Sequence, residues 1–77
     1  MSKERHYYKI KVHRYPPYYP INKDYYKTEY VWGYTQDGAE NSFYRYHKDS
    51  YGDNVAEEFE EITKEEYYSI PKYDRIN

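Results

Sequence analysis

Hydrophobic and polar positions alternate along His6–Tyr15, the first patterned segment of the chain. One side of an extended chain would carry the apolar residues Tyr8, Ile10 and Val12. The opposite side would carry basic and aromatic residues, namely Tyr7, Lys9, Lys11, His13 and Tyr15. A period of two is typical of a half-buried strand, and Pro16 and Pro17 end it because proline cannot donate to a β-ladder.

A second alternating segment covers Tyr25–Tyr34. One side would carry Tyr26, Thr28, Tyr30, Trp32 and Tyr34. The other would carry Tyr25, Lys27, Glu29 and Val31. The pattern predicts a second strand.

The residues after this segment favour a hairpin. Thr35–Gly38 predicts a tight turn, since Gly38 can take the left-handed conformation that a short hairpin loop requires. Ser42–Lys48 then alternates again, with Tyr44 and Tyr46 on one side. We therefore expect a third strand at Ser42–Lys48.

The acidic segment Val55–Ile62 fits two structures. Val55, Phe59 and Ile62 have helical spacing, and Asn54 before them is a good N-cap. Glutamates around one Phe are equally typical of an edge strand, where charge prevents unwanted pairing. Thr63–Glu66 forms a capping box that predicts a short helix, and Pro71 ends it.

These elements predict one small α+β domain over residues 1–77. We expect an antiparallel β-meander of three to four strands, with a short C-terminal helical segment packed on one face. A chain of 77 residues buries only about 60% of its unfolded surface, so a large pocket is not expected.

Tyrosine replaces the aliphatic residues that usually build a core. The chain has no Leu, five Ile, three Val and two Phe, but fifteen Tyr. Buried rings remove large areas from water, yet fifteen exceed the places in so small an interior. We expect the surplus to form an outward surface suited to binding, because tyrosine is favoured at interfaces.

Charge is divided unevenly along the chain. Residues 1–52 carry +3 and residues 53–77 carry −5. The glutamates of the second part could face solvent, neutralise the first part, or steer the protein to a basic partner. No Asp-x-Asp-x-Asp-Gly pattern supports a calcium loop.

Catalytic, cofactor and metal sites are not expected. There is no Cys, no HExxH, no nucleophile elbow and no phosphate-binding glycine loop. His13 and His47 would need further ligands to hold zinc. The lack of disulfides and of an apolar leader or membrane span indicates a cytoplasmic protein.

Two motifs suggest specific partners. Cations and rings on the outward sheet face would suit single-stranded RNA or DNA, and the candidate residues are Lys9, Lys11, His13, Tyr25, Lys27, Phe43, Arg45 and His47. Pro16-Pro17-Tyr18-Tyr19 matches the Pro-Pro-x-Tyr pattern that WW domains bind, although it also reads as a rigid connection between strands.

The leading hypothesis is a non-enzymatic protein-binding module. In size and composition the chain is similar to small phage or mobile-element proteins that inhibit a host protein, such as a defence or nucleic-acid-handling protein. The residues expected to bind are Tyr18, Tyr19, Tyr51, Glu57, Glu58, Glu60, Glu61, Tyr67 and Tyr68. A single-stranded nucleic-acid-binding domain and a homo-oligomeric structural subunit are the alternatives.

Overall fold

The first two strands form where the alternation predicts them. The computed structural model describes residues 3–76, in which β1 covers His6–Tyr15 and β2 covers Tyr25–Gly33. The two strands pair antiparallel, with Tyr8 opposite Val31 and Lys11 opposite Thr28.

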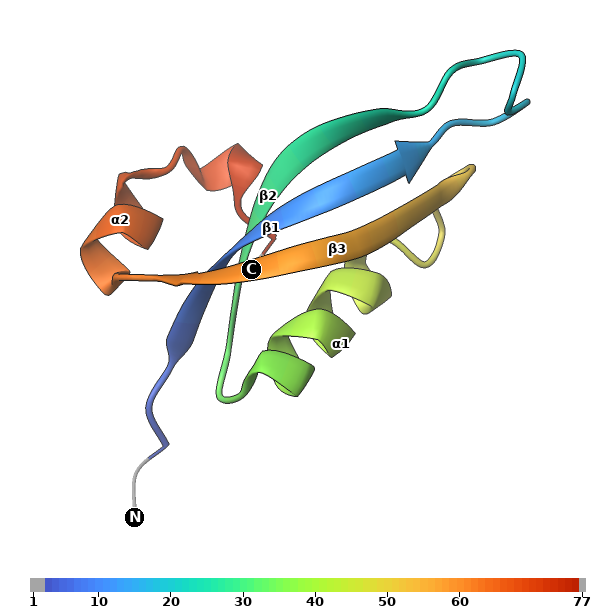
Figure 1. Ribbon diagram of the computed structural model, residues 1–77. Coiled ribbons are helices and arrows are strands. Elements are labelled where there is room, and N and C mark those ends of the chain that lie inside the picture. The colour runs from blue at the N-terminus through green and yellow to red at the C-terminus, as the bar shows by residue number, and fades with distance from the viewer. Residues whose placement is uncertain (1–2, 77) are drawn as a thin grey trace.

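The third strand is β3, Asp53–Ile62, and it pairs antiparallel with the other side of β1. The strand order is therefore β2-β1-β3, with the first strand in the centre. The predicted α+β class with an antiparallel sheet is confirmed, but the connections are not those of a meander. Helix α1, Gln36–Tyr46, links the two outer strands (Figure 1).

The predicted hairpin and strand at Ser42–Lys48 are wrong, because this segment lies in and just after α1. Thr35 caps the helix, and its Oγ1 accepts a hydrogen bond from the Gly38 amide at 2.9 Å. Ala39 and Phe43, four residues apart, are both fully buried against the sheet. Helical spacing of these two apolar residues outweighs the alternation of Tyr44 and Tyr46, which are both exposed.

Close packing of α1 depends on the residue that ends β2. A Cβ atom at Gly33 would lie 2.5 Å from the backbone nitrogen of Ala39. Only glycine therefore lets the first turn of the helix approach the strand end this closely.

Residues 55–62 belong to β3, so the edge-strand alternative is correct and the helix is not. A register shift between Lys11 and Val12 places a β-bulge in this strand. The bulge lets Ala56, opposite Val12, and Phe59, opposite Ile10, share the inner face although they are three residues apart. Asn54, expected as a helix cap, is a buried strand residue.

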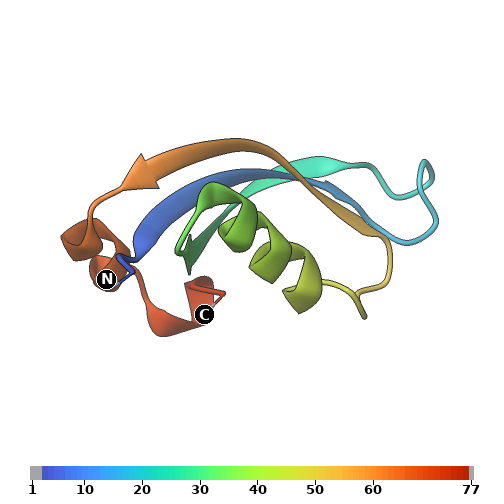
Figure 2. The same cartoon turned by 90° about the horizontal axis from the view of Figure 1, so that it is seen from below.

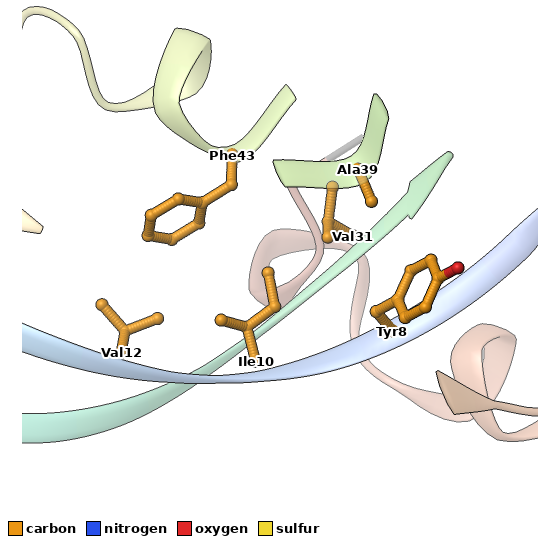
Figure 3. Close-up of a cluster of buried hydrophobic side chains, with 6 residues drawn as sticks. All are labelled: Tyr8, Ile10, Val12, Val31, Ala39 and Phe43. Carbon is orange, nitrogen blue, oxygen red and sulfur yellow. The ribbon is translucent and has the colours of Figure 1, made fainter. Parts of the chain in front are cut away.

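The main core lies between α1 and the inner face of the sheet. It consists of Tyr8, Ile10, Val12, Val31, Ala39 and Phe43. Figure 3 shows the ring of Phe43 reaching from the helix toward Ile10 and Val12 of the central strand. The residues predicted to be buried on β1, Tyr8, Ile10 and Val12, are thus buried here. Tyr7, predicted on the outward side, is also buried.

A second cluster is built on tyrosine. Tyr7, Ile62 and Tyr67 are buried together, and Tyr30 and Trp32 pack against them. Tyr67 belongs to α2, Lys64–Ser69, the short helix that the sequence predicts after Thr63, and Thr63 is its N-cap: Thr63 Oγ1 accepts from the Glu66 amide at 3.1 Å. In Figure 1, α2 and α1 lie on opposite sides of the strands.

The C-terminal segment returns to the sheet. A 3-10 turn, η1, covers Lys72–Asp74, and the Ile76 amide then donates to the Tyr30 carbonyl at 2.8 Å. The molecule is elongated, with principal dimensions of 49 × 23 × 19 Å. Figure 2 shows the sheet arching over α1, with α2 at one end and the β1–β2 loop at the other. No helix within residues 3–76 is long and apolar enough to cross a membrane.

Candidate functional site: an aromatic tip beside an acidic strand

The β1–β2 loop, residues 16–24, projects from one end of the molecule (Figure 1). Tyr18, Tyr19 and Ile21 in this loop have 80%, 50% and 85% of their surface exposed. The loop is ordered by its own backbone, since the Ile21 amide donates to the Tyr18 carbonyl at 2.8 Å. Asn22 Nδ2 also donates to the Pro17 carbonyl at 2.7 Å. Large apolar side chains are therefore presented to solvent on a structured loop.

A second loop brings Tyr51 to the same end. Its backbone carbonyl accepts a hydrogen bond from Arg14 Nη2 at the end of β1. Gly52 has a φ of +82°, and a Cβ atom there would lie 2.2 Å from the Tyr15 carbonyl oxygen. These contacts hold Tyr51, 83% exposed, beside the base of the β1–β2 loop. We call Tyr18, Tyr19, Ile21 and Tyr51 the aromatic tip.

The Pro-Pro-x-Tyr motif lies within this loop but does not have the extended form that WW domains bind. Tyr18 has a φ of +66°, and residues 17–20 form a turn. A polyproline helix requires a φ near −75° at each position. The motif is a folded connection between two strands in this structure.

Below the tip, His13 is enclosed by two rings and two carboxylates. The rings of Tyr15 and Tyr26 stack on it, with centroids at 4.2 and 4.3 Å. Its Nε2 contacts Asp24, and its Nδ1 lies 3.0 Å from a carboxylate oxygen of Glu57. The cluster joins β1 to the start of β2 and to the bulge of β3.

The cluster favours the charged form of His13. The hydrogen bond to Asp24 raises the pKa of His13, burial opposes this, and Glu57 adds to the increase. The same hydrogen bond lowers the pKa of Asp24. Because both ring nitrogens are engaged, the imidazole is not free to act as a general base or as a metal ligand.

The other two histidines are also paired with carboxylates. His6 Nδ1 lies 2.7 Å from Glu61, and His47 Nε2 lies 2.6 Å from Glu29. Within residues 3–76, no group of three His, Asp or Glu side chains is placed to hold a metal ion. His13 and His47 do not form a pair, because His13 lies on the outer face of the sheet, whereas His47 follows α1 and contacts Glu29 on the inner face.

The predicted acidic residues Glu57, Glu58, Glu60 and Glu61 are all exposed on β3. β3 is an outer strand of the sheet, and it contains no Lys or Arg. Its register places Glu58 opposite Lys11 and Glu60 opposite Lys9. Opposite charges across neighbouring strands stabilise the pairing, and a charged edge discourages the addition of another strand.

The predicted protein-binding set is therefore divided among three places. The tip holds Tyr18, Tyr19 and Tyr51, and β3 holds the four glutamates. Tyr68 is 48% exposed at the opposite end of the molecule, on α2. Tyr67 is fully buried and cannot contact a partner, since its position in the short helix turns it toward Tyr7.

The predicted nucleic-acid set does not share one face. Lys9, Lys11 and His13 lie on the outer face, whereas Tyr25 and Lys27 lie opposite Arg14 and Val12 on the other face. Phe43 is fully buried in the core, Arg45 lies in the last turn of α1, and His47 follows that helix. The division arises because the predicted third strand is a helix and because the register pairs the lysines with Thr28 and Tyr30.

Three residues of the tip and the His13 cluster were not predicted as site residues from the sequence. Ile21 joins the tip, and Asp24 and Tyr26 complete the His13 cluster. The sequence contained one usable signal for Tyr26, its alternation with Tyr30 and Trp32 on a single face. Asp24 lies in a connection without periodicity, so nothing in the pattern predicted its contact.

Comparison with known proteins returned no match: no family model, no curated protein and no solved structure is significantly similar to the chain.

Proposed function

We propose that the protein is a non-enzymatic binding module that contacts a protein partner through the aromatic tip and the glutamates of β3. The observation that carries this proposal is the exposure of Tyr18, Tyr19, Ile21 and Tyr51 together at one end of an elongated molecule. Exposed apolar side chains gathered in one place mark interaction sites more often than scattered ones do.

The chemistry of the surface indicates the kind of partner. Tyrosine supplies a large contact area with few rotatable bonds, so an ordered loop that bears two of them loses little entropy on binding. The partner would offer an apolar cavity for the tip and basic residues for β3. Opposite charge would steer the two proteins together. A protein that handles nucleic acid has such a basic surface, and occupation of that surface by this chain would inhibit it.

The proposal is tested by affinity capture from cells of the native source, followed by mass spectrometry. The bait is the full chain, compared with a Tyr18→Ser, Tyr19→Ser, Ile21→Ser variant. Tyr73→Ser is the matched control, because Tyr73 is 87% exposed but lies in η1. We expect a protein that the wild type and the control retain and that the tip variant loses.

The captured protein is then purified and titrated by calorimetry. The tip variant should bind at least about tenfold more weakly, since interface anchors contribute about 2 kcal/mol or more. Changing Glu58, Glu60 and Glu61 to Gln should reduce the association rate, and added salt should have the same effect. Equal capture by all variants would contradict the proposal. A second copy would be identified as the partner if light scattering showed a dimer for the wild type and a monomer for the tip variant.

Binding of single-stranded nucleic acid on the lysine face has less support. Lys9 and Lys11 have Glu60 and Glu58 directly across the neighbouring strand. Carboxylates on the neighbouring strand repel phosphates that approach these lysines. A gel shift at low salt tests this alternative directly.

A further inference from the structure

A small basic pocket lies at the end of the molecule away from the tip. It has a volume of about 340 Å³ and is formed by the segment before β1, the end of β2, α2 and the C-terminal segment. Its lining residues are Arg5, Trp32, Tyr68, Lys72, Arg75 and Ile76. Three of the six are cations and two are aromatic, and none of the lining residues among positions 3–76 carries a carboxylate.

Aromatic rings hold the two guanidinium groups in place. The Arg5 guanidinium lies 4.1 Å from the centroid of Trp32. The Arg75 guanidinium lies 5.3 and 5.1 Å from the centroids of Tyr67 and Tyr68. Stacking uses the face of a guanidinium and leaves the N–H groups at its edge to donate hydrogen bonds. Arg5 already donates to the hydroxyl groups of Tyr34 and Tyr68, and its remaining N–H groups are the ones available to a ligand.

These cations are not neutralised by neighbours in the part of the chain that the structure describes. The ion pairs within residues 3–76 involve Lys27 and the three histidines, and none includes Arg5, Lys72 or Arg75. Arg75 Nε is buried and has no hydrogen-bond acceptor among these residues. The pocket therefore differs from the lysine face, where glutamates oppose each lysine.

We propose that this pocket binds a nucleotide, with the phosphate held by Arg5, Lys72 and Arg75 and the base placed against the aromatic side chains. Arginine and lysine form strong charge-assisted hydrogen bonds to phosphate oxygens. Aromatic rings and guanidinium planes accept a stacked base with little regard to its identity. The volume lies at the lower end of the range for small-molecule sites, so it suits one nucleotide.

The inference goes beyond the proposed function and is independent of it. β1 has ten residues, which at about 3.3 Å per residue separate the pocket from the tip by roughly 30 Å. Loss of nucleotide binding would leave capture through the tip intact, and loss of capture would leave the pocket intact.

Trp32, the one tryptophan of the chain, lines the pocket and provides the signal for the test. Its fluorescence is followed as the full chain is titrated with adenosine monophosphate, and calorimetry confirms the binding curve. We expect a saturable change, with adenosine and inorganic phosphate each binding at least about tenfold more weakly because each supplies half of the contacts. A 5′-phosphorylated oligothymidylate that binds more tightly than the mononucleotide would assign the end of a single strand as ligand, and weaker binding would assign a free nucleotide.

Variants separate binding in the pocket from general attraction of anions. Lys72→Gln should weaken binding of the monophosphate about tenfold or more, because a hydrogen bond to a charged group is lost. Lys48→Gln, the same change on an exposed lysine beyond α1, should leave it unaltered. Arg5→Lys keeps the charge and loses the stacking on Trp32, so it should also weaken binding while circular dichroism stays that of the folded chain. Equal effects of Lys72→Gln and Lys48→Gln, no saturable signal, or tighter binding of phosphotyrosine than of the monophosphate would overturn the proposal.

Discussion

The two hydrophobic clusters of this protein are built from different residues on opposite faces of the same strand. The cluster under α1 consists mainly of Ile10, Val12, Val31 and Phe43. The cluster under α2 is centred on Tyr7 and Tyr67, whose ring centroids lie 4.8 Å apart. Adjacent residues of β1, Tyr7 and Tyr8, thus enter different clusters.

The difference shows how a chain without leucine divides its few aliphatic residues from its many tyrosines. Close-packed aliphatic residues fill the space between sheet and longest helix, where polar atoms are costly. Tyrosines build the smaller cluster, where the hydroxyl can reach solvent or a polar partner. The remaining rings lie outside: ten of the fifteen tyrosines are exposed, as the composition predicted.

Removal of the Phe43 ring should have the largest effect on stability. Phe43→Ala leaves a cavity between α1 and the sheet and should lower the free energy of unfolding by about 3–5 kcal/mol. Urea denaturation followed by circular dichroism measures the loss. Tyr46→Ala on the same helix is the control, and because Tyr46 is 60% exposed its effect should stay below about 1 kcal/mol. Similar losses in the two variants would show that the α1 cluster is not the main core.

Removal of the Tyr67 ring should have a smaller and more local effect. Tyr67→Ala should cost about 2–3 kcal/mol, below the Phe43 value, since α2 has only six residues and can separate without exposing the α1 cluster. Hydrogen exchange should then increase in α2 and remain unchanged in α1. Faster exchange throughout the chain would instead mean that the two clusters unfold as one unit.

The sequence predicted correctly those regions in which the alternation of apolar and polar residues matches the burial seen in the structure. Strands β1 and β2 and the capped helix α2 were predicted because their patterns are regular and local. α1 was missed because exposed tyrosines at positions 44 and 46 imitate a strand, while only Ala39 and Phe43 mark the helix. In so tyrosine-rich a chain, an aromatic residue is a weak sign of burial.

The helical spacing of Val55, Phe59 and Ile62 does not form one face in β3. Phe59 lies opposite Ile10 on the inner face, whereas Val55 and Ile62 lie opposite His13 and Tyr7 on the outer face. The tip residues Tyr18, Tyr19 and Tyr51 were predicted from composition alone. The His13 cluster and the basic pocket were not predictable, because they join residues from segments that come together only through strand order.

The N-terminal caps of the two helices allow a finer comparison of the same two regions. Thr35→Ala removes the acceptor for the Gly38 amide and should cost about 1 kcal/mol, because α1 is part of the main core. Thr63→Ala removes the acceptor for the Glu66 amide and should cost about 0.5 kcal/mol, because α2 is shorter and peripheral. Thermal unfolding of the two variants measures both effects, and a larger loss for Thr63→Ala would reverse the ranking of the two regions.

The smallest expected effect concerns the charged His13 cluster, which joins the base of the tip to the sheet. The cluster under α2, in contrast, is held together by aromatic rings. The pKa of His13 is raised in the folded protein, so its contribution to stability is fully present below the unfolded pKa of about 6.5 and is lost as pH rises through the folded pKa. The pKa of Asp24 is lowered, so its contribution is present above its ordinary value of 3.8 and is lost as pH falls through the folded pKa. The cluster should stabilise the base of the tip most between these two limits.

Titration of the His13 ring proton by nuclear magnetic resonance tests this assignment. Asp24→Asn should lower the pKa of His13 more than Glu57→Gln does, because the hydrogen bond to Asp24 makes the largest contribution. Asp74→Asn, in η1 and outside the His13 cluster, should leave the titration unchanged. If Glu57→Gln lowered the pKa of His13 more than Asp24→Asn did, Glu57 in the bulge of β3 rather than Asp24 in the loop before β2 would be the main partner of His13. The base of the tip would then be anchored chiefly to the acidic strand.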